Sequence, residues 1–444
     1  MSRLVCHLFC AVAAIGALST SAGAQLLSPH ALPPVGLPGP AGNLPIAGPL
    51  LQNVLSQPAA QQAIRPTLDS VGGLTETIAQ SGPATLLDLR RIRLDNLISS
   101  NRASVESDGT GLPVRRGIIA LLDPDAVGLQ AATRAGFRIL ADDRDPELGL
   151  RVVSLAVPSG TSARSGLRLL KKVAPQLQAD FDHLFEPAGG SLAPMVGALA
   201  AAPERGGNRV IGMIDGGVAS HPSLAGKSIE QHGFAGAPQP TGHGTAVASL
   251  LVGSQGPFRG AASGARLFVA DVYGGNRAAG SATTIVRALS WLSVHRPQVI
   301  NISLVGPPNK LVQKAVQIVE ARGIQVVAAV GNDGPAAPPQ YPASYPGVLA
   351  VTAVDASGRA LPEAGKAAHL DFAAPGADMA AAVPGQGYAR VRGTSFAAPL
   401  AAARLVAAGS PAALALEARP GRGRVGRGIV CSACRTDPRS VGVR

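Results

Sequence analysis

Three segments of the sequence place a reactive side chain among glycines, in the order aspartate, histidine, serine. Asp215 ends an apolar run and precedes two glycines, His243 lies between two glycines, and Ser395 follows Gly-Thr and precedes Phe-Ala-Ala-Pro. A serine hydroxyl becomes a good nucleophile when an imidazole accepts its proton and a carboxylate holds the other ring nitrogen. Each residue alone is explained equally well as a turn, core or cap residue. Together, and in an order known for such triads, they indicate nucleophilic acyl transfer.

Asn332, in the segment Val-Gly-Asn-Asp-Gly, is a candidate for stabilising negative charge. The transition state of acyl transfer develops charge on the carbonyl oxygen and needs preorganised N–H donors. An asparagine amide supplies one donor. The backbone N–H of a serine that opens a helix supplies another, reinforced by the helix dipole. Taken alone, Asn332 is a turn former.

The elements that must position these residues are predicted by apolar periodicity. Near-continuous runs of Val, Ile, Leu and Ala are typical of strands buried on both faces of a parallel sheet, and they span residues 210–215, 265–271, 299–304, 325–329 and 348–354. Helices are expected at 243–251, 281–295, 309–322 and 395–407, the last after the final strand. This alternation predicts a doubly wound α/β fold with a mostly parallel sheet, in which ligands bind at the carboxyl ends of the strands.

Residues 116–187 predict a separate, small α+β unit. Strands are expected at 117–122, 137–141, 150–157 and 178–185. One helix should follow an N-cap at Asp123 and end at Gly136, and another should begin after residues 159–162. The order β-α-β-β-α-β is the split ferredoxin-like pattern, which by itself carries no function. Upstream, residues 51–103 include an amphipathic helix.

The chain resembles the subtilisin-like serine proteases, or subtilases, over about residues 205–407. The resemblance rests on Ile-Asp215-Gly-Gly-Val-x-x-His-Pro-x-Leu, Gly-His243-Gly-Thr-x-Val-Ala, Asn301-Ile-Ser-Leu, Gly-Asn332-Asp-Gly, Tyr-Pro342-Ala-x-Tyr-Pro and Gly-Thr-Ser395-x-Ala-Ala-Pro. It implies a serine endopeptidase in which Ser395 is the nucleophile and His243 the general base. It also implies that Asp215 orients the base and that Asn332 is the side-chain oxyanion donor.

Four further expectations follow from the resemblance. Residues Ser303, Leu304 and Val305 would form a strand that pairs with extended protein or peptide substrates, and the peptide bond before Pro342 would be cis. Residues 113–187 would be a pro-segment that helps the peptidase domain fold and blocks its active site. Self-cleavage between residues 187 and 208 would release this intramolecular inhibitor.

The sequence departs from the family pattern at Gly216, where the family usually has Ser or Thr. A hydroxyl hydrogen bond to the Asp215 carboxylate is then missing, which could alter its pKa. Few acidic residues cluster anywhere, so we expect neither a metal site nor a cofactor.

The first residues predict export. Arg3 precedes an apolar run at residues 4–18 that is too short to span a bilayer, and Ala22-Gly23-Ala24 is a typical signal-peptidase site. The alternative is an uncleaved anchor. We therefore predict a signal peptide at 1–24, a Pro-rich linker and helical leader at 25–112, the pro-segment at 113–187, the peptidase domain at 188–430 and a tail at 431–444. The mature protein would be secreted or periplasmic, with no membrane span.

Composition excludes some functions and leaves the cysteines open. The net charge is +12, with 39 basic and 27 acidic residues, but aromatic residues are only 3% and the basic residues do not interleave with them. Nucleic-acid binding is therefore not expected. After signal cleavage only Cys431 and Cys434 remain. Zinc would need about four ligands, so a local disulfide is favoured, with two free thiols as the alternative.

Functions other than peptide hydrolysis stay open at this level. A subtilase fold that has lost activity could serve as a binding module, and an esterase or peptide ligase could use the same fold. All three triad positions and Asn332 are filled. This favours the active peptidase, because an inactive scaffold need not keep them.

Overall fold

A parallel β-sheet organises residues 209–443. A computed structural model describes residues 83–189, 191–195, 209–385 and 387–443 of the chain, and the predicted signal peptide and most of the linker lie outside them. Across the sheet the strands are β17 (Phe372–Pro375), β16 (Leu349–Val354), β15 (Gln325–Ala329), β13 (Val299–Ile302), β8 (Val210–Asp215), β12 (Arg266–Asp271) and β9 (Ile229–Gly233). Every pairing in this sheet is parallel.

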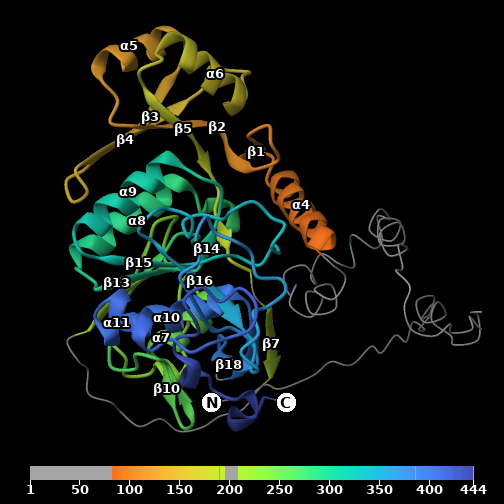
Figure 1. Ribbon diagram of the computed structural model, residues 1–444. Coiled ribbons are helices and arrows are strands. Elements are labelled where there is room, and N and C mark those ends of the chain that lie inside the picture. The colour runs from red at the N-terminus through yellow and green to blue at the C-terminus, as the bar shows by residue number, and fades with distance from the viewer. Residues whose placement is uncertain (1–82, 190, 196–208, 386, 444) are drawn as a thin grey trace, which may run out of the picture. The chain divides into compact units, whose positions relative to one another are not determined.

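Helices cover both faces of the sheet (Figure 1), as the sequence predicts. They are α7 (Gly242–Val252), α8 (Ala282–Val294), α9 (Lys310–Ala321), α10 (Thr394–Ala408) and the short α11 (Pro411–Leu416). Successive strand residues point to opposite faces: Ile211 and Met213 pack in the cluster that contains α7 and α10, whereas Ile214 packs with α8 and α9. The doubly wound α/β fold is confirmed.

The chain between β16 and α10 is more elaborate than expected. The prediction that helix 395–407 follows a final strand at 348–354 is wrong, because β17, β18 (Met379–Ala382) and β19 (Tyr388–Arg392) intervene. β18 and β19 form an antiparallel hairpin, and β7 (Ser191–Met195) adds to its β19 edge. β17 and β18 are short and rich in alanine, and β19 carries two arginines, so none of the three shows the long apolar run that marked the other strands.

The upstream unit has the predicted β-α-β-β-α-β order. Its elements are β2 (Pro113–Leu122), α5 (Ala126–Arg134), β3 (Arg138–Asp145), β4 (Leu150–Ala156), α6 (Ala163–Val173) and β5 (Gln178–His183). β2 lies between β4 and β5, with β3 outside β4, and all pairings are antiparallel. β1 (Val105–Ser107) also pairs with β2, so this sheet begins before residue 113.

The start of α5 differs from the prediction by two residues. Asp125, not Asp123, is the N-cap, and its side chain accepts from the N–H of Gly128. Asp123 has φ +44° and instead accepts from the N–H of Arg151 at 2.7 Å. Both aspartates flank Pro124, so the sequence alone did not separate them.

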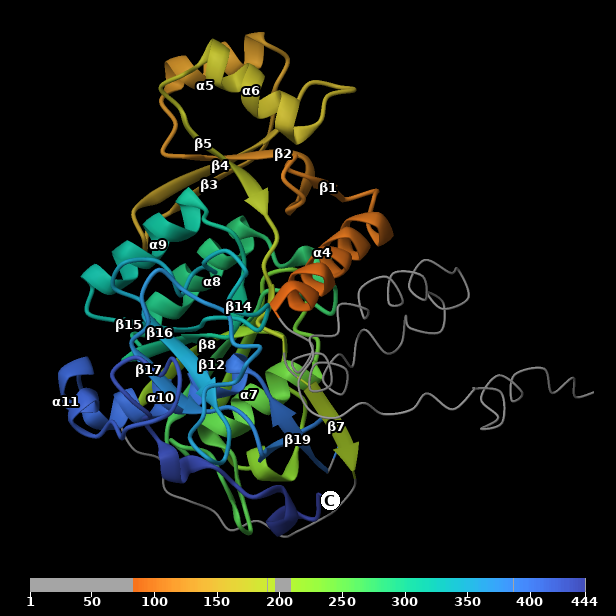
Figure 2. The ribbon, with the colours of Figure 1, turned by 45° about the vertical axis from the view of Figure 1, so that its right-hand side comes forward.

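The upstream helix and the C-terminal tail complete the described chain. Helix α4 (Pro83–Ser100) precedes β1, and in both ribbon views it lies apart from the α5 and α6 layer (Figure 2). The remaining strands are short: β6 (Glu186–Pro187), β14 (Leu304–Val305), β10 (Ser254–Gln255) and β11 (Phe258–Arg259). The Cys431–Cys434 disulfide and the cis bond before Pro342 are both present, as predicted. None of the described helices is long and apolar enough to cross a membrane.

Candidate active site

Asp215 lies at the carboxyl end of β8, in the interior of the sheet. Its side chain is 1% exposed, and its neighbour across the parallel pair is Asp271 on β12. One carboxylate oxygen accepts from the N–H of Gly216 at 2.7 Å. Both oxygens lie 2.9 Å from Nδ1 of His243. The end of β8 therefore places the carboxylate in direct contact with the imidazole.

His243 lies in the first turn of α7, which places its ring beside Asp215 at the carboxyl end of β8. Thr241 caps this helix by accepting from the N–H of Gly244 at 2.9 Å. The carboxylate of Asp215 requires a proton on Nδ1, which leaves Nε2 as the accepting nitrogen. Nε2 is buried and has no hydrogen-bond partner among the described residues. It is therefore free to take a proton.

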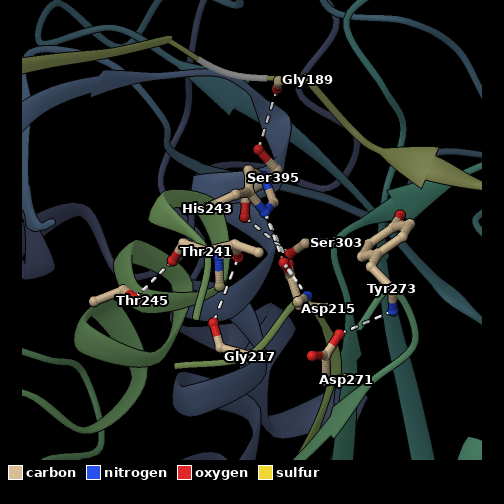
Figure 3. A network of polar contacts seen from close by, with 12 residues as sticks. Gly189, Asp215, Gly217, Thr241, His243, Thr245, Asp271, Tyr273, Ser303 and Ser395 are labelled. Carbon is tan, nitrogen blue, oxygen red and sulfur yellow. Dashed lines mark hydrogen bonds and ion pairs between the residues drawn. The ribbon is translucent and has the colours of Figure 1, made fainter. Parts of the chain in front are cut away.

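Ser395 is the second residue of α10 and is fully buried. Gly393 precedes this helix with φ +141°, a conformation that favours glycine. The hydroxyl of Ser395 donates to the carbonyl oxygen of Gly189 at 3.1 Å (Figure 3). The carbonyl of Ser395 accepts from Oγ of Ser303 at 2.9 Å, which ties the start of α10 to the neighbouring strand.

The glycine at position 216 is explained by a steric contact that the sequence did not reveal. A Cβ at this position would lie 2.5 Å from Oγ1 and 2.7 Å from Cγ2 of Thr241. Thr241 therefore occupies the space that a serine or threonine side chain at position 216 would need. The carboxylate of Asp215 receives a backbone N–H from Gly216 in place of a hydroxyl at that position.

Asn332 follows β15 and is held by the start of α10. Its Oδ1 accepts from the N–H of Thr394 at 3.0 Å, which turns Nδ2 away from the helix. Nδ2 contacts the carbonyl oxygens of Ala188 and Gly189. The structure thus brings the predicted donor and Ser395 to the same short stretch of chain.

That stretch, Ala188 and Gly189, is the end of a segment whose residues 185–188, here called the docked strand, pair with the predicted substrate-binding residues. β6 runs antiparallel to β14, with Leu304 opposite Pro187 and Val305 opposite Glu186. The N–H of Ala188 donates to the carbonyl of Ser303 at 2.8 Å. The edge predicted to take extended substrate is thus occupied by the end of the upstream unit.

Phe185, at the start of the docked strand, is fully buried against residues that the sequence analysis missed. Its N–H donates to the carbonyl of Gly280 at 2.7 Å, and its carbonyl accepts from the hydroxyl of Tyr273 at 3.1 Å. A Cβ at Gly306 would lie 2.5 Å from the Phe185 ring. Because this site forms from separate segments of the chain, no local pattern in the sequence predicted it.

The described residues hold no group of three or more His, Cys, Asp or Glu side chains suited to a metal ion. Hydrogen-bond donors, an imidazole and a hydroxyl make up the site. Such a set supports acid–base and nucleophilic chemistry.

Comparisons with known proteins agree with this geometry. The Subtilase family profile matches residues 206–420. Subtilisin Savinase from Lederbergia lenta is 34% identical over 194 residues, which cover 43% of this chain and 71% of that protein. An alkaline protease from Alkalihalobacillus alcalophilus is also 34% identical over 194 residues, which span 43% of this chain but only half of that protein.

The fold is also shared with a solved structure. Fervidolysin from Fervidobacterium pennivorans, described as a keratinolytic enzyme related to subtilisin, aligns with a TM-score of 0.60 and 18% identity, covering 72% of this chain and 61% of its own. The chain belongs to the subtilase family and is a subtilisin-like serine endopeptidase.

Proposed function

We propose that this chain is an exported endopeptidase that hydrolyses peptide bonds through an acyl-enzyme and is made as a precursor that cleaves itself. Ser395 is the nucleophile, His243 the general base, Asp215 the residue that orients it and Asn332 the oxyanion donor. The observation that supports this most is the docked strand, whose Ala188 carbonyl contacts Asn332 while the next carbonyl accepts from Ser395.

In the proposed reaction, Oγ of Ser395 attacks a carbonyl carbon as its proton passes to Nε2 of His243. Asp215, 2.9 Å from Nδ1, stabilises the imidazolium. Nδ2 of Asn332 donates to the oxyanion. His243 then gives the proton to the leaving amine, and water hydrolyses the acyl ester through the same base. In the precursor the serine hydroxyl must first rotate from the Gly189 carbonyl towards Nε2.

The bond we expect to be cut in the precursor is Ala188–Gly189. The N–H of Ala188 donates to Ser303 and its carbonyl accepts from Asn332, so this residue is held on both sides. Gly189 has φ +67°, so the extended conformation ends at Ala188. Hydrolysis would release residues up to 188 and leave Gly189 as the new N-terminus, inside the predicted range.

The released pro-segment would remain an inhibitor as long as it stays bound. The docked strand satisfies the backbone of β14 and fills the Phe185 site, so an external polypeptide has to displace both. Two carboxylates of β5 also bind the pro-segment to the peptidase region. Asp180 accepts from the N–H of Lys310 at 2.9 Å, and Asp182 accepts from the N–H of Thr283 at 3.0 Å, at the starts of α9 and α8.

Export is supported by residues 1–24, whose charge and apolar pattern are those of a signal peptide. These residues lie outside the described part of the chain. One relative, 30% identical over 203 residues, is named the minor extracellular protease Epr of Bacillus subtilis. A disulfide between Cys431 and Cys434 also fits an oxidising compartment.

The test is Ser395→Ala in the full chain, with Ser410→Ala as the matched control at the N-cap of α11. We expect wild type and the control to yield a new N-terminus at Gly189, to react with a fluorophosphonate probe and to hydrolyse peptides. The Ser395→Ala protein should do none of these. Self-cleavage that persists in Ser395→Ala would refute the scheme, and a wild type that neither reacts nor cleaves would indicate an inactive binding module.

A further inference from the structure

Helix α4 is not part of the ferredoxin-like unit, yet it contacts peptidase loops near both ends of the docked strand. Near its start, Leu86 is buried against Gly334, where a Cβ would lie 2.7 Å from the leucine side chain. Near its end, Leu97 and Ile98 pack in a small cluster that includes Ala278 of the peptidase domain and Leu184, just before the docked strand. The helix therefore reaches the loop after Asn332 and the loop after Tyr273.

Between these two ends, charged groups join α4 to the active-site loop. Arg93 lies 3.0 Å from one oxygen of Asp333 and 3.2 Å from the other, and Arg90 lies 3.1 Å from Asp333. The side chain of Asp333 is only 6% exposed. Asp333 follows directly after Asn332, the proposed oxyanion donor.

Arg93 also holds the docked strand itself. Its Nε donates to Oε2 of Glu186 at 3.2 Å, and the Glu186 side chain is 9% exposed. Burial lowers the pKa of Arg93, but Asp333 and Glu186 raise it above its usual value, so the guanidinium stays charged. One side chain thus bridges the strand to be cut and the loop that carries Asn332.

We propose that α4 is the outer part of the inhibitory segment and that Arg93 locks it across the docked strand. This inference depends on the proposed self-cleavage. The inhibitor then includes residues 83–100 as well as the unit that begins near residue 113. After cleavage at Ala188–Gly189 the bridge persists, because Arg93, Glu186 and Asp333 all remain in place. Because α4 and the ferredoxin-like unit are covalently linked, each stays close to its binding site while the other is bound. This slows release of the whole segment.

The test separates cutting from release in the full chain. Arg93→Gln, the double variant Arg90→Gln/Arg93→Gln and a matched control, Arg91→Gln, are compared with wild type. Arg91 is on the same helix, but its one ion-pair partner among the residues that the structure describes is Asp88 at 3.6 Å, and both side chains are at least 65% exposed. Self-cleavage is followed by gel and N-terminal sequencing. Release is followed as the appearance of activity on an external peptide.

We expect Arg93→Gln to cut itself within about twofold of the wild-type rate but to become active about tenfold sooner. Loss of one partner of a desolvated charge pair mainly raises the dissociation rate, and the effect is moderated here because Arg93 is 35% exposed. The double variant should release still faster, because Asp333 loses both partners. Arg91→Gln should behave as wild type.

Equal activation times for Arg93→Gln and Arg91→Gln, with normal self-cleavage, would overturn this inference alone. Absence of self-cleavage in wild type would overturn the proposed function. For that case, hydrogen exchange in the uncut Ser395→Ala chain tests the contact directly. Adding Arg93→Gln should speed exchange of the α4 amides about tenfold and adding Arg91→Gln should not. Equal exchange would show that Arg93 does not hold the helix.

Discussion

The peptidase region and the ferredoxin-like unit cover their sheets in different ways. In the peptidase sheet, both faces of the central strands are covered by helices of the same region, α7 and α10 on one side and α8 and α9 on the other. In β2 of the upstream unit, Ile119 and Leu121 pack under α5 and α6. Ala120 and Leu122, on the opposite face, belong to the cluster that contains α8 and α9 of the peptidase region.

This difference is consistent with the proposed release of the upstream unit. The upstream unit has one core of its own and one apolar face that only the peptidase region covers, with α9 in contact with both β2 and β5. Figure 1 shows α8 and α9 between the upstream sheet and the peptidase sheet. The proposed release would expose that face to water, at a free-energy cost of about 25 cal/mol per Å² of apolar surface. The peptidase region keeps two complete faces.

The largest effect that tests this division is expected at Asn332, where the two regions meet. Asn332→Ala should lower the turnover of external peptides by about 10² to 10³, since it removes a preorganised donor. Self-cleavage should slow by a similar factor, because the proposed oxyanion donor would serve both reactions. A variant that cuts itself slowly but hydrolyses external peptides normally would show that Asn332 only anchors the docked strand. Initial rates on a chromogenic peptide and on the precursor provide the measurement.

A second effect compares the two faces of β2. Leu121→Ala should destabilise the upstream unit by about 2 to 5 kcal/mol, because it opens a cavity in its own core. Leu122→Ala should weaken docking on the peptidase region and leave that core intact. Hydrogen exchange of the α6 amides in the Ser395→Ala chain distinguishes the two variants, because only Leu121→Ala should accelerate it. If Leu122→Ala accelerated α6 exchange as much as Leu121→Ala, the two faces would not be separate.

The same comparison shows what could be predicted from sequence. Runs of Val, Ile and Leu marked β8, β15 and β16 because central parallel strands are buried on both faces. The edge strand β9, Ile-Glu-Gln-His-Gly, was missed because its exposed side selects polar residues. Asp215, His243 and Ser395 were predicted because each stands where a strand or helix begins or ends.

The parts of the site that could not be predicted all depend on pairing between distant segments. The bonds of Phe185 to Gly280 and Tyr273 join residues about 90 positions apart, and Arg93 meets Asp333 across 240 positions. No local pattern encodes such partners. Gly216 carried a signal, its departure from the family, but the cause was the side chain of Thr241, which follows it at a distance in the chain.

The smallest expected effect is on the pH dependence of stability. It contrasts two carboxyl groups, one from each region. In Asp108, beside β1, burial raises the pKa, but the His183 ring 3.9 Å away and hydrogen bonds from Thr110 lower it to about 2. In Glu320, near the end of α9, burial raises the pKa to about 7 from 4.5, and its Oε1 has no hydrogen-bond partner among the described residues. Asp108 is thus stabilised as an anion and Glu320 as a neutral acid.

The sign of the Glu320 effect follows from linkage. Between pH 4.5 and about 7 the unfolded chain has lost this proton while the folded chain keeps it, so stability falls as pH rises through this window. Glu320→Gln removes the dependence. After allowance for partial exposure, we expect the variant to be about 1 to 2 kcal/mol more stable than the parent at pH 8 and equal at pH 4.5. Thermal unfolding in the Ser395→Ala background measures this. A variant that is less stable at pH 8 would mean that the Glu320 carboxylate has a partner and that burial does not oppose its charge.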